Sequence, residues 1–459
     1  MKRNLVFAGV LIATALAAME STIVSTAAPS ITSDLSDLER ISWIFSVYML
    51  ASAIAAPIMG KLADIYGVKK LFVIGMTIFL IGSLGSGMAS TMSQLIVFRA
   101  IQGFGGGAVF PICRTIIGII FENEKERAKA QGWDTAIYGI SGVVGPLFGG
   151  FLVDVASWRY VFLLTLPIGI IASIFIVVFY KEEVDNVKHK IDYAGAITFA
   201  ISATSLIFVL SEGTNMGWFN PMIIGLTAIG VISLISFVLI ERRAVEPLVP
   251  ISLFKDRGVV IANVLTLFVG ALSIGIITYI PTWGQTVMGN SASQSGLMLT
   301  PYLILWTGGS FIVGFLVDKL QSGTIMKSGA VSLIIGTLLL TFANENTPDI
   351  FIFICTGLLG LGMGLIVPLL IVYIQSNVSG KELGSAMGLN AFVNTLSQSV
   401  GVTIFGVIYS VFSTTQVSVT NGTEIGIHSI FIGTFALAII TFATTLLLKS
   451  KDSKQENYN

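Results

Sequence analysis

Four charged residues in the first third of the chain lie inside long apolar runs. They are two carboxylates, Glu20 and Asp134, and two guanidinium groups, Arg99 and Arg114. A charge at the centre of a bilayer costs about 2.5–3.5 kcal/mol on insertion scales, so such charges pair with each other or mark a path for ions or substrates. A carboxylate that takes a proton from one side and releases it on the other couples proton movement to a second event.

The composition predicts that these charges lie on helices that cross a membrane. Of the 459 residues, 54% are hydrophobic and only 11% are charged, against roughly 25% charged in soluble domains. Apolar windows of about 20 residues, the length that crosses a bilayer as a helix, predict fourteen spans. They lie at 5–28, 42–60, 71–89, 94–120, 129–152, 159–179, 193–211, 221–240, 259–282, 295–317, 327–343, 349–374, 384–412 and 428–448.

The distribution of positive charge orients these spans. With fourteen spans, one side of the membrane receives 21 of the 25 Lys and Arg. Arg40 and Arg159 fall on the other side, and Arg99 and Arg114 lie within spans. Because cytoplasmic loops carry the excess of Lys and Arg, we expect both termini in the cytoplasm.

Two segments of the first half recur in the second half. Gly60, Leu62 and Asp64 recur 254 residues later, ending at Asp318. Three glycines and a proline, beginning at Gly103, recur 257 residues later. This repeat predicts two six-helix bundles at 1–180 and 258–450, two inserted helices with their linkers at 181–257, and a tail at 451–459. Paired halves with a site between them at the midplane are typical of transporters.

Several motifs resemble those of the major facilitator superfamily, and specifically of its fourteen-helix drug:proton antiporter branch. Residues 60–70 resemble the cytoplasmic loop motif of the superfamily, residues 99–103 its helix-4 motif, and residues 142–150 the helix-5 motif of antiporters. Residues 19–29 and 158–167 resemble the helix-1 and helix-6 motifs of the branch, with Glu20 in place of an aspartate. The positions that carry the loop and helix-5 motifs are Gly60, Asp64, Gly67, Lys69, Lys70, Gly142, Gly145, Pro146, Gly149 and Gly150.

The resemblance implies an all-α major facilitator fold and proton-driven export of drugs or other amphipathic, often cationic, compounds by alternating access. It implies a bacterial plasma membrane, and we expect a monomer. Asp64, Lys69 and Lys70 would belong to a latch that steadies one facing state. The alternative on the same scaffold is an exporter of a metabolite, a lipid or a monovalent cation.

Depth along the helices, at about 1.5 Å per residue, predicts how the four buried charges pair. Glu20 and Arg99 fall at similar depth in the outer half, and Asp134 and Arg114 fall level with each other in the inner half. We therefore expect two layers, each holding a carboxylate and an arginine, as the proton-coupling residues. A purely structural role for either pair stays open, since a buried ion pair is weak evidence of function.

Polar and aromatic residues around these charges are candidates for substrate contact. Glu20 and Asp134 would attract a cationic compound, and Phe110, Trp133 and Tyr138 would offer it aromatic faces. In the second half, Asn390, Asn394 and Gln398 form one polar stripe at four-residue spacing, and the repeat places no charge opposite Arg99, Arg114 or Asp134. Packing between helices is the competing interpretation for the aromatic residues and for the stripe.

The residue types present argue against other functional classes. The two histidines, His189 and His428, lie in a loop and near a helix end. We see no metal-ligand cluster and no nucleophile–base motif, so we expect no enzyme activity, metal or cofactor. The net charge of zero argues against a nucleic-acid partner. A channel fits the charge asymmetry of the repeated halves less well than alternating access does.

Overall fold

The computed structural model describes residues 2–35, 40–182, 192–244, 246–413 and 419–448, which form helices without any β-strand. The first half of the chain contributes α1 (Lys2–Leu35), α2 (Ile41–Tyr66), α3 (Val68–Met88), α4 (Met92–Ile120), α5 (Glu124–Val155), α6 (Arg159–Leu163) and α7 (Thr165–Phe179). The inserted pair is α8 (Tyr193–Met216) and α9 (Pro221–Glu241), which is followed by the short α10 (Ser252–Lys255).

The second half repeats the scheme. It contains α11 (Arg257–Thr286), α12 (Ala292–Leu297), α13 (Thr300–Leu316), α14 (Ser322–Leu340), α15 (Asp349–Asn377), the 3-10 turn η1 (Gly380–Glu382), α16 (Leu383–Ser413) and α17 (Val419–Thr445). Fourteen helical segments are long and apolar enough to cross a membrane, which confirms the predicted count. The predicted tail at 451–459 and residues 183–191 of the predicted linker lie outside the described residues.

Two predicted spans are interrupted. The span predicted at 159–179 is divided at Leu164 into α6 and α7. Pro167 follows three residues later, and because proline has no backbone N–H it cannot donate to the carbonyl of Leu163. The span predicted at 295–317 is likewise divided into α12 and α13, with Pro301 in the first turn of α13.

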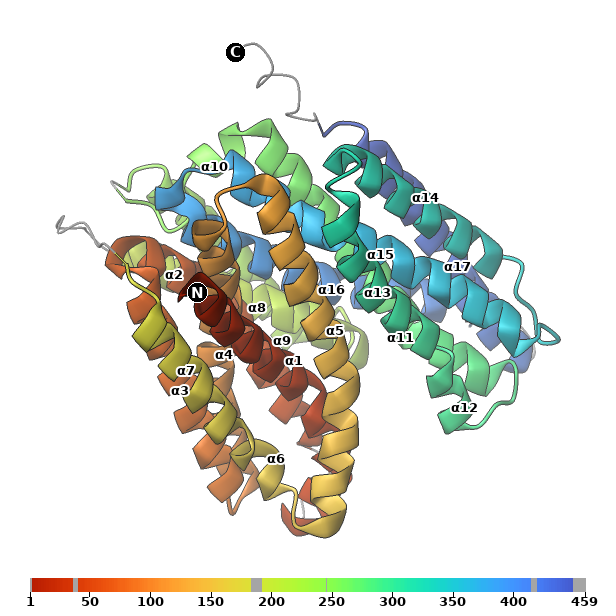
Figure 1. Ribbon diagram of the computed structural model, residues 1–459. Coiled ribbons are helices and arrows are strands. Elements are labelled where there is room, and N and C mark those ends of the chain that lie inside the picture. Colours follow the sequence, from red (N-terminus) through yellow and green to blue (C-terminus); the bar gives the residue numbers. More distant parts are fainter. Residues whose placement is uncertain (1, 36–39, 183–191, 245, 414–418, 449–459) are drawn as a thin grey trace.

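The helices form two lobes that meet at one end of the molecule (Figure 1). One lobe contains α1–α7 and the other contains α11–α17, and α5 lies beside α13 where the lobes touch. The inserted α8 packs against α9, α2 and α16. The ring of Phe208 on α8 lies 5.8 Å from that of Trp43 on α2, and the Thr403 hydroxyl of α16 donates to the Leu210 carbonyl at 2.6 Å. The inserted pair therefore contacts both lobes.

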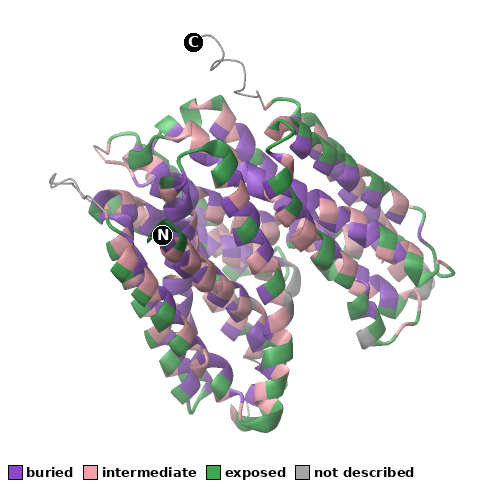
Figure 2. Ribbon diagram, viewed as in Figure 1, coloured by how far each residue is buried: buried purple, intermediate pink, exposed green. Residues whose placement is uncertain are grey.

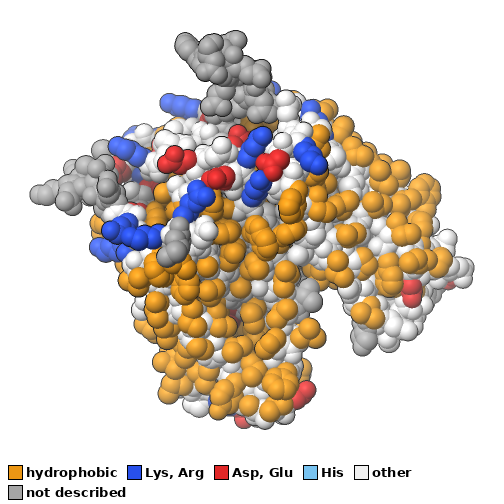
Figure 3. Space-filling view, in the orientation of Figure 1, with side chains coloured by type: hydrophobic (Ala, Val, Ile, Leu, Met, Phe, Trp, Pro, Cys, Tyr) orange, Lys and Arg blue, Asp and Glu red, His pale blue; other side chains and the backbone are white. Residues whose placement is uncertain are grey.

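Apolar and charged side chains are distributed over the surface as in a membrane protein. Figure 2 shows exposed residues along the outer faces of the helices, and many of these are large apolar side chains such as Ile81, Phe151 and Ile232. Figure 3 shows a wide apolar band, with Lys and Arg gathered at the end where the lobes meet. In the same view the molecule is hollowed between the lobes at the opposite end.

The internal repeat is visible in helix packing. Gly103 of α4 lies against the backbone of Tyr48 on α2, and Gly360 of α15 lies against the backbone of Tyr302 on α13. Tyr302 is the repeat partner of Tyr48, 254 residues later. The glycines therefore serve close helix approach in both lobes, as small residues do in membrane proteins generally.

Replacing Gly105 by Ala tests this packing. A Cβ at Gly105 would clash with the backbone of Phe79 on α3, whereas a Cβ at Gly225, on the exposed face of α9, would meet nothing within 4 Å. We expect Gly105→Ala to lose about 1–3 kcal/mol of stability through overpacking. Gly225→Ala should be neutral or slightly stabilising, because alanine favours helices by up to about 1 kcal/mol over glycine. Thermal unfolding of the purified variants, monitored by size-exclusion chromatography, gives the Tm of each. Equal Tm values for Gly105→Ala and Gly225→Ala would contradict the packing role.

Candidate functional site

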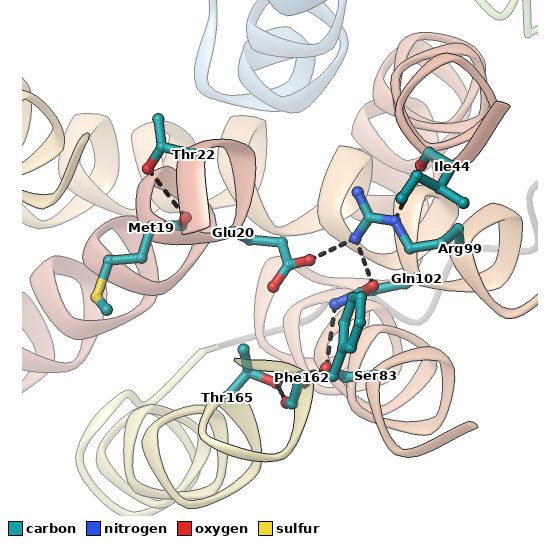
Figure 4. A network of polar contacts seen from close by, with 9 residues as sticks. All are labelled: Met19, Glu20, Thr22, Ile44, Ser83, Arg99, Gln102, Phe162 and Thr165. Atoms are coloured by element: carbon teal, nitrogen blue, oxygen red, sulfur yellow. Dashed lines mark hydrogen bonds and ion pairs between the residues drawn. The ribbon is translucent and has the colours of Figure 1, made fainter. Parts of the chain in front are cut away.

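The first predicted pair forms as expected. Glu20 on α1 is fully buried and makes an ion pair with the buried Arg99 on α4 (Figure 4). The guanidinium also donates from Nε to the Ile44 carbonyl oxygen at 3.0 Å. Its centre lies 4.2 Å from the ring centroid of Tyr48. Arg99 is thus fixed on several sides, and it holds the Glu20 carboxylate in the middle of the first lobe.

The pair continues into a chain of hydrogen bonds. Arg99 Nη1 donates to Gln102 Oε1 at 2.7 Å, and Gln102 Nε2 donates to Ser83 Oγ on α3 at 3.1 Å. The Ser83 hydroxyl lies 2.9 Å from the Phe162 carbonyl and 2.6 Å from the Thr165 hydroxyl, at the break between α6 and α7. Within the described residues, Oε2 of Glu20 has no hydrogen-bond partner. One carboxylate oxygen is therefore left for a proton while the other faces Arg99.

The second predicted pair differs from the expectation. The buried Asp134 on α5 accepts a hydrogen bond from the Thr14 hydroxyl of α1 at 2.6 Å. The guanidinium of Arg114 lies over the ring of Phe110, 4.2 Å from its centroid. Asp134 and Arg114 interact electrostatically, but in the described part of the chain they form no ion pair within 4.0 Å. Asp134 is hydrogen-bonded to Thr14 and Arg114 lies against Phe110, so the two charges interact at longer range and are not direct partners.

Two of the predicted aromatic residues, together with Asp134 and Arg114, form what we call the inner region, after the inner half in which their depth along the helices placed these charges. The rings of Phe110 on α4 and Tyr138 on α5 lie 5.4 Å apart. With Asp134 and Arg114 they bring a carboxylate, a guanidinium and two aromatic rings together between α4 and α5. Trp133 does not join them, since it is exposed and packs edge-on against Phe311 of α13 at 4.6 Å, across the contact between the lobes.

The helix-5 motif packs against the helix that carries Glu20. A Cβ at Gly145 would clash with the Thr22 hydroxyl, and one at Gly149 would clash with the Thr26 hydroxyl. Gly142 and Gly150 face open space, and Pro146 lies within the helix. Half of the motif glycines therefore allow α5 to approach α1 next to Glu20.

The loop motif joins the two lobes. Asp64, near the end of α2, accepts hydrogen bonds from the backbone N–H groups of Gly384 at 2.6 Å and Ser385 at 2.7 Å. These are the first turn of α16, where free N–H groups and the helix dipole favour a negative charge. Gly60 lies so close to Gly384 that a Cβ would clash with its carbonyl oxygen.

The rest of the loop motif stays within the first lobe. Gly67 has a φ of 94°, which favours glycine. Lys69 Nζ donates to the Tyr180 carbonyl at 2.9 Å, and its backbone N–H donates to Glu182 at 2.9 Å. The Lys70 ammonium lies 5.4 Å from the ring centroid of Tyr66.

A second contact closes the same end of the molecule at its surface. Lys129 of α5 pairs with Asp318 at 2.7 Å. The hydrogen bond from Lys129 holds the pKa of the Asp318 carboxyl below its usual value. Asp318 is the repeat partner of Asp64, so both copies of this aspartate contact the other lobe.

The polar stripe of α16 serves two kinds of contact. Asn390 is buried and donates to Thr266 at 3.0 Å and to Asn263 at 3.3 Å, both on α11. Gln398 donates to Asn394 at 3.0 Å, and these two side chains are half-buried. Asn390 therefore joins two helices, whereas Asn394 and Gln398 keep a partly open polar face.

Sequence reasoning missed several members of the site. Gln102 and Ser83 extend the Glu20–Arg99 pair, and Thr14 is the partner of Asp134. The spacing of Arg99 and Gln102, three residues apart on one helix face, was a usable signal. Thr14 carried no such signal. Among the described residues, no cluster of His, Cys, Asp or Glu is arranged to hold a metal ion.

Removing Arg99 while keeping Glu20 tests the pair. We expect Arg99→Met to lose about 3–5 kcal/mol of stability, because it leaves an uncompensated buried carboxylate. Adding Glu20→Gln to that variant should restore much of the loss, since no buried charge then remains. Thermal unfolding of the two variants and of Glu20→Gln alone completes the cycle. Additive losses in the double variant would contradict a direct interaction.

Comparisons with known proteins agree with this architecture. The family model of the Major Facilitator Superfamily matches residues 10–402. Multidrug resistance protein 3 of Bacillus subtilis (strain 168) is 38% identical over 87% of this chain and 78% of its own length. Multidrug transporter protein MdtP of the same organism is 37% identical over 89% of this chain and 75% of its own.

A solved structure shares the fold. The crystal structure of the human organic anion transporter MFSD10 superposes with a TM-score of 0.69, covering 96% of this chain and 99% of that one at 14% identity. At this identity the likeness concerns the fold alone. With its fourteen candidate spans and its bacterial relatives, the chain belongs to the Major Facilitator Superfamily and is a multi-pass transporter of a bacterial plasma membrane.

Proposed function

We propose that this protein is a proton-coupled antiporter that exports drugs or other amphipathic, often cationic, compounds by alternating access. The observation that carries the proposal is the fully buried Glu20, which pairs with Arg99 through one oxygen and whose other oxygen has no partner among the residues that the structure describes. A transporter needs an energy source, and a titratable carboxylate deep in a membrane lobe is a means of using a proton gradient. The multidrug relatives support the class of substrate.

Protonation of Glu20 changes the charge of its site and therefore the stability of the present arrangement. A neutral carboxyl no longer attracts Arg99 as an anion does, so the helices α1 and α4 are held together less strongly. A ligand shifts a conformational equilibrium only by its different affinity for the two states. In this proposal the proton supplies that difference at Glu20, and the compound supplies it at the inner region around Asp134.

The proposed orientation follows from charge. The Lys- and Arg-rich end, where Asp64 contacts α16 and Lys129 contacts Asp318, would face the cytoplasm with both termini by the positive-inside rule. The lobes touch at this end and are hollowed at the other (Figure 3). The present arrangement is then the outward-facing one, with the Asp64 contact as its latch. The six-helix units at 1–180 and 258–450 are the proposed moving bodies.

The inner region is the proposed substrate contact. Asp134 provides a negative charge, Phe110 and Tyr138 provide aromatic faces, and Asn394 and Gln398 provide a neutral polar face from the other lobe. This set suits an amphipathic cation, because the carboxylate attracts its charge and the rings contact its apolar body. We further propose that the transporter acts as a monomer.

Glu20→Gln tests proton coupling. The change keeps the shape of the side chain but removes its titration, so we expect substrate-driven proton movement in proteoliposomes to fall at least about tenfold, which corresponds to roughly 1.4 kcal/mol. Tm should fall, because Arg99 is left as a buried charge without its counter-ion, so proton movement is compared per amount of folded protein. Glu345→Gln, at an exposed loop residue, is the matched control. Full proton-coupled efflux by the Glu20 variant would exclude Glu20 as the coupling group.

Asp134→Asn tests the substrate contact. We expect efflux of quaternary ammonium compounds to fall by about tenfold, or roughly 1.4 kcal/mol, with a smaller effect on neutral compounds. The measurement is a panel efflux assay with dyes, fluoroquinolones and quaternary ammonium compounds in a pump-deficient host. Asp154→Asn, an exposed position on the same helix, serves as the control. If the Asp134 variant exports both cationic and neutral compounds as well as its parent does, Asp134 is not part of the substrate site.

A further inference from the structure

A cavity of about 480 Å³ lies outside the region described above, between the inserted helix pair and the second lobe. Its walls come from α8, α9, the segment around α10, and α16. This volume is within the range of roughly 300–1,000 Å³ that drug-sized ligands occupy. The cavity therefore has room for a small amphipathic molecule.

The interior of the cavity is apolar and aromatic. The ring of Phe199 on α8 lies 5.4 Å from that of Phe237 on α9 and 5.0 Å from that of Phe392 on α16. All three rings line the cavity, together with the buried Ala203. A ligand here would bury an alkyl or aryl body against three helices.

Part of the cavity wall consists of side chains that are exposed on the surface of the molecule. Leu234 and Val238 on α9, and Ile251 and Phe254 at α10, line the cavity and are exposed. Exposed apolar side chains on a membrane-spanning helix face lipid rather than water. A molecule dissolved in the bilayer therefore reaches this cavity directly, without passing between the two lobes.

One buried carboxylate lines the cavity. Glu241, the last residue of α9, is 6% exposed. Its Oε1 accepts a hydrogen bond from the Leu248 N–H at 3.0 Å, but its Oε2 has no hydrogen-bond partner in the part of the chain that the structure describes. A buried polar atom without a partner is costly, and a negative charge at the C-terminal end of a helix is also unfavourable.

The charged neighbours do not neutralise Glu241. Asp192, the N-cap of α8, and Lys61 on α2 are close enough to interact electrostatically with the Glu241 carboxylate, which Asp192 repels and Lys61 attracts. Arg242 lines the cavity but is exposed at its rim. Over the described residues, Glu241 forms no ion pair within 4.0 Å. Oε2 thus lacks a hydrogen-bond or ion-pair partner among the described residues, and a cation that comes with a ligand would supply one.

We propose that this cavity is a second binding site, which takes an amphipathic amine from the bilayer, with the apolar body among Phe199, Phe237 and Phe392 and the cationic nitrogen at Glu241. Two sources share this chemistry: a membrane-dissolved cationic compound and a phospholipid with an amino headgroup. The site is separate from Glu20 and Asp134, so its occupancy does not depend on proton coupling.

Photolabelling of the full-length protein in phosphatidylcholine nanodiscs tests the site. The probes are a diazirine-bearing dodecyltrimethylammonium, the matching neutral dodecanol, and a diazirine-bearing phosphatidylethanolamine. Mass spectrometry locates the labelled peptides. We expect the ammonium probe to label peptides of α8, α9 and α16, with about tenfold less labelling in Glu241→Gln, because the attraction between the carboxylate and the ammonium charge is lost.

Matched variants complete the design. Ala203→Phe fills the cavity and should block labelling, whereas Ala228→Phe, on the exposed face of α9, and Glu345→Gln should leave it unchanged. Labelling of the same peptides by the phosphatidylethanolamine probe, with the same loss in Glu241→Gln, identifies a lipid as occupant; labelling by the ammonium probe alone identifies a dissolved cation. Equal labelling by the neutral probe, or labelling by the ammonium and phosphatidylethanolamine probes that is insensitive to Glu241→Gln, overturns the proposal.

Discussion

The cost of burying a carboxylate in a low-dielectric interior determines how the first lobe is built. Removing an ion from water costs several kcal/mol even after relaxation, and an opposite charge compensates only when its other donors are also satisfied. Arg99 meets this requirement because it bonds Glu20, Gln102 and the Ile44 carbonyl, and lies over the Tyr48 ring. These contacts bring α1, α2 and α4 to one point, and Gln102 and Ser83 extend them to α3 and the α6–α7 break. The pair is therefore a structural centre, and in the proposed mechanism a single proton there would change the electrostatics of several helices.

The two lobes share their packing but not their charges. The glycines of α4 and α15 approach their neighbouring helices in equivalent ways, and Tyr48 and Tyr302 occupy equivalent positions. At the repeat position of Arg99, however, the second lobe has Thr356, whose hydroxyl is satisfied by the Ile352 carbonyl of its own helix at 3.0 Å. Backbone packing thus constrains both halves equally, whereas the titratable groups are free to diverge. The second lobe offers a neutral framework against which a change in the first lobe acts.

Features that depend only on position along the chain, such as the length of a helix and the depth of a residue in it, were predictable from the sequence. Features that depend on the rotation of a helix about its axis were not. Hydropathy gives length, and so the fourteen spans were predicted correctly. Depth along a helix placed Glu20 level with Arg99, and the two do pair. The same reasoning placed Arg114 level with Asp134, but depth says nothing about which way a side chain points, and Thr14 is the bonded partner. The contact of Asp64 with Gly384 and Ser385 joins residues that are 320 and 321 positions apart. The burial of Glu241 depends on a linker that folds back onto it, and neither feature has a local signal.

The helix α16 is where the separate features meet. Its first turn donates to Asp64, its polar face bonds α11 through Asn390, and its apolar face carries Phe392 into the lateral cavity. Hydrogen bonds to a charged group contribute roughly 1.5–3 kcal/mol each, so the contact at Asp64 is strong enough to favour one arrangement of the lobes and weak enough to be broken. A shift from 1:99 to 99:1 between two states needs about 5.5 kcal/mol of differential binding, which is comparable to the loss of two such bonds. The hydrogen bonds to Asp64 are therefore of the same size as the free energy that separates two such populations, so under the proposed alternating access their loss would be enough to change the favoured arrangement of the lobes.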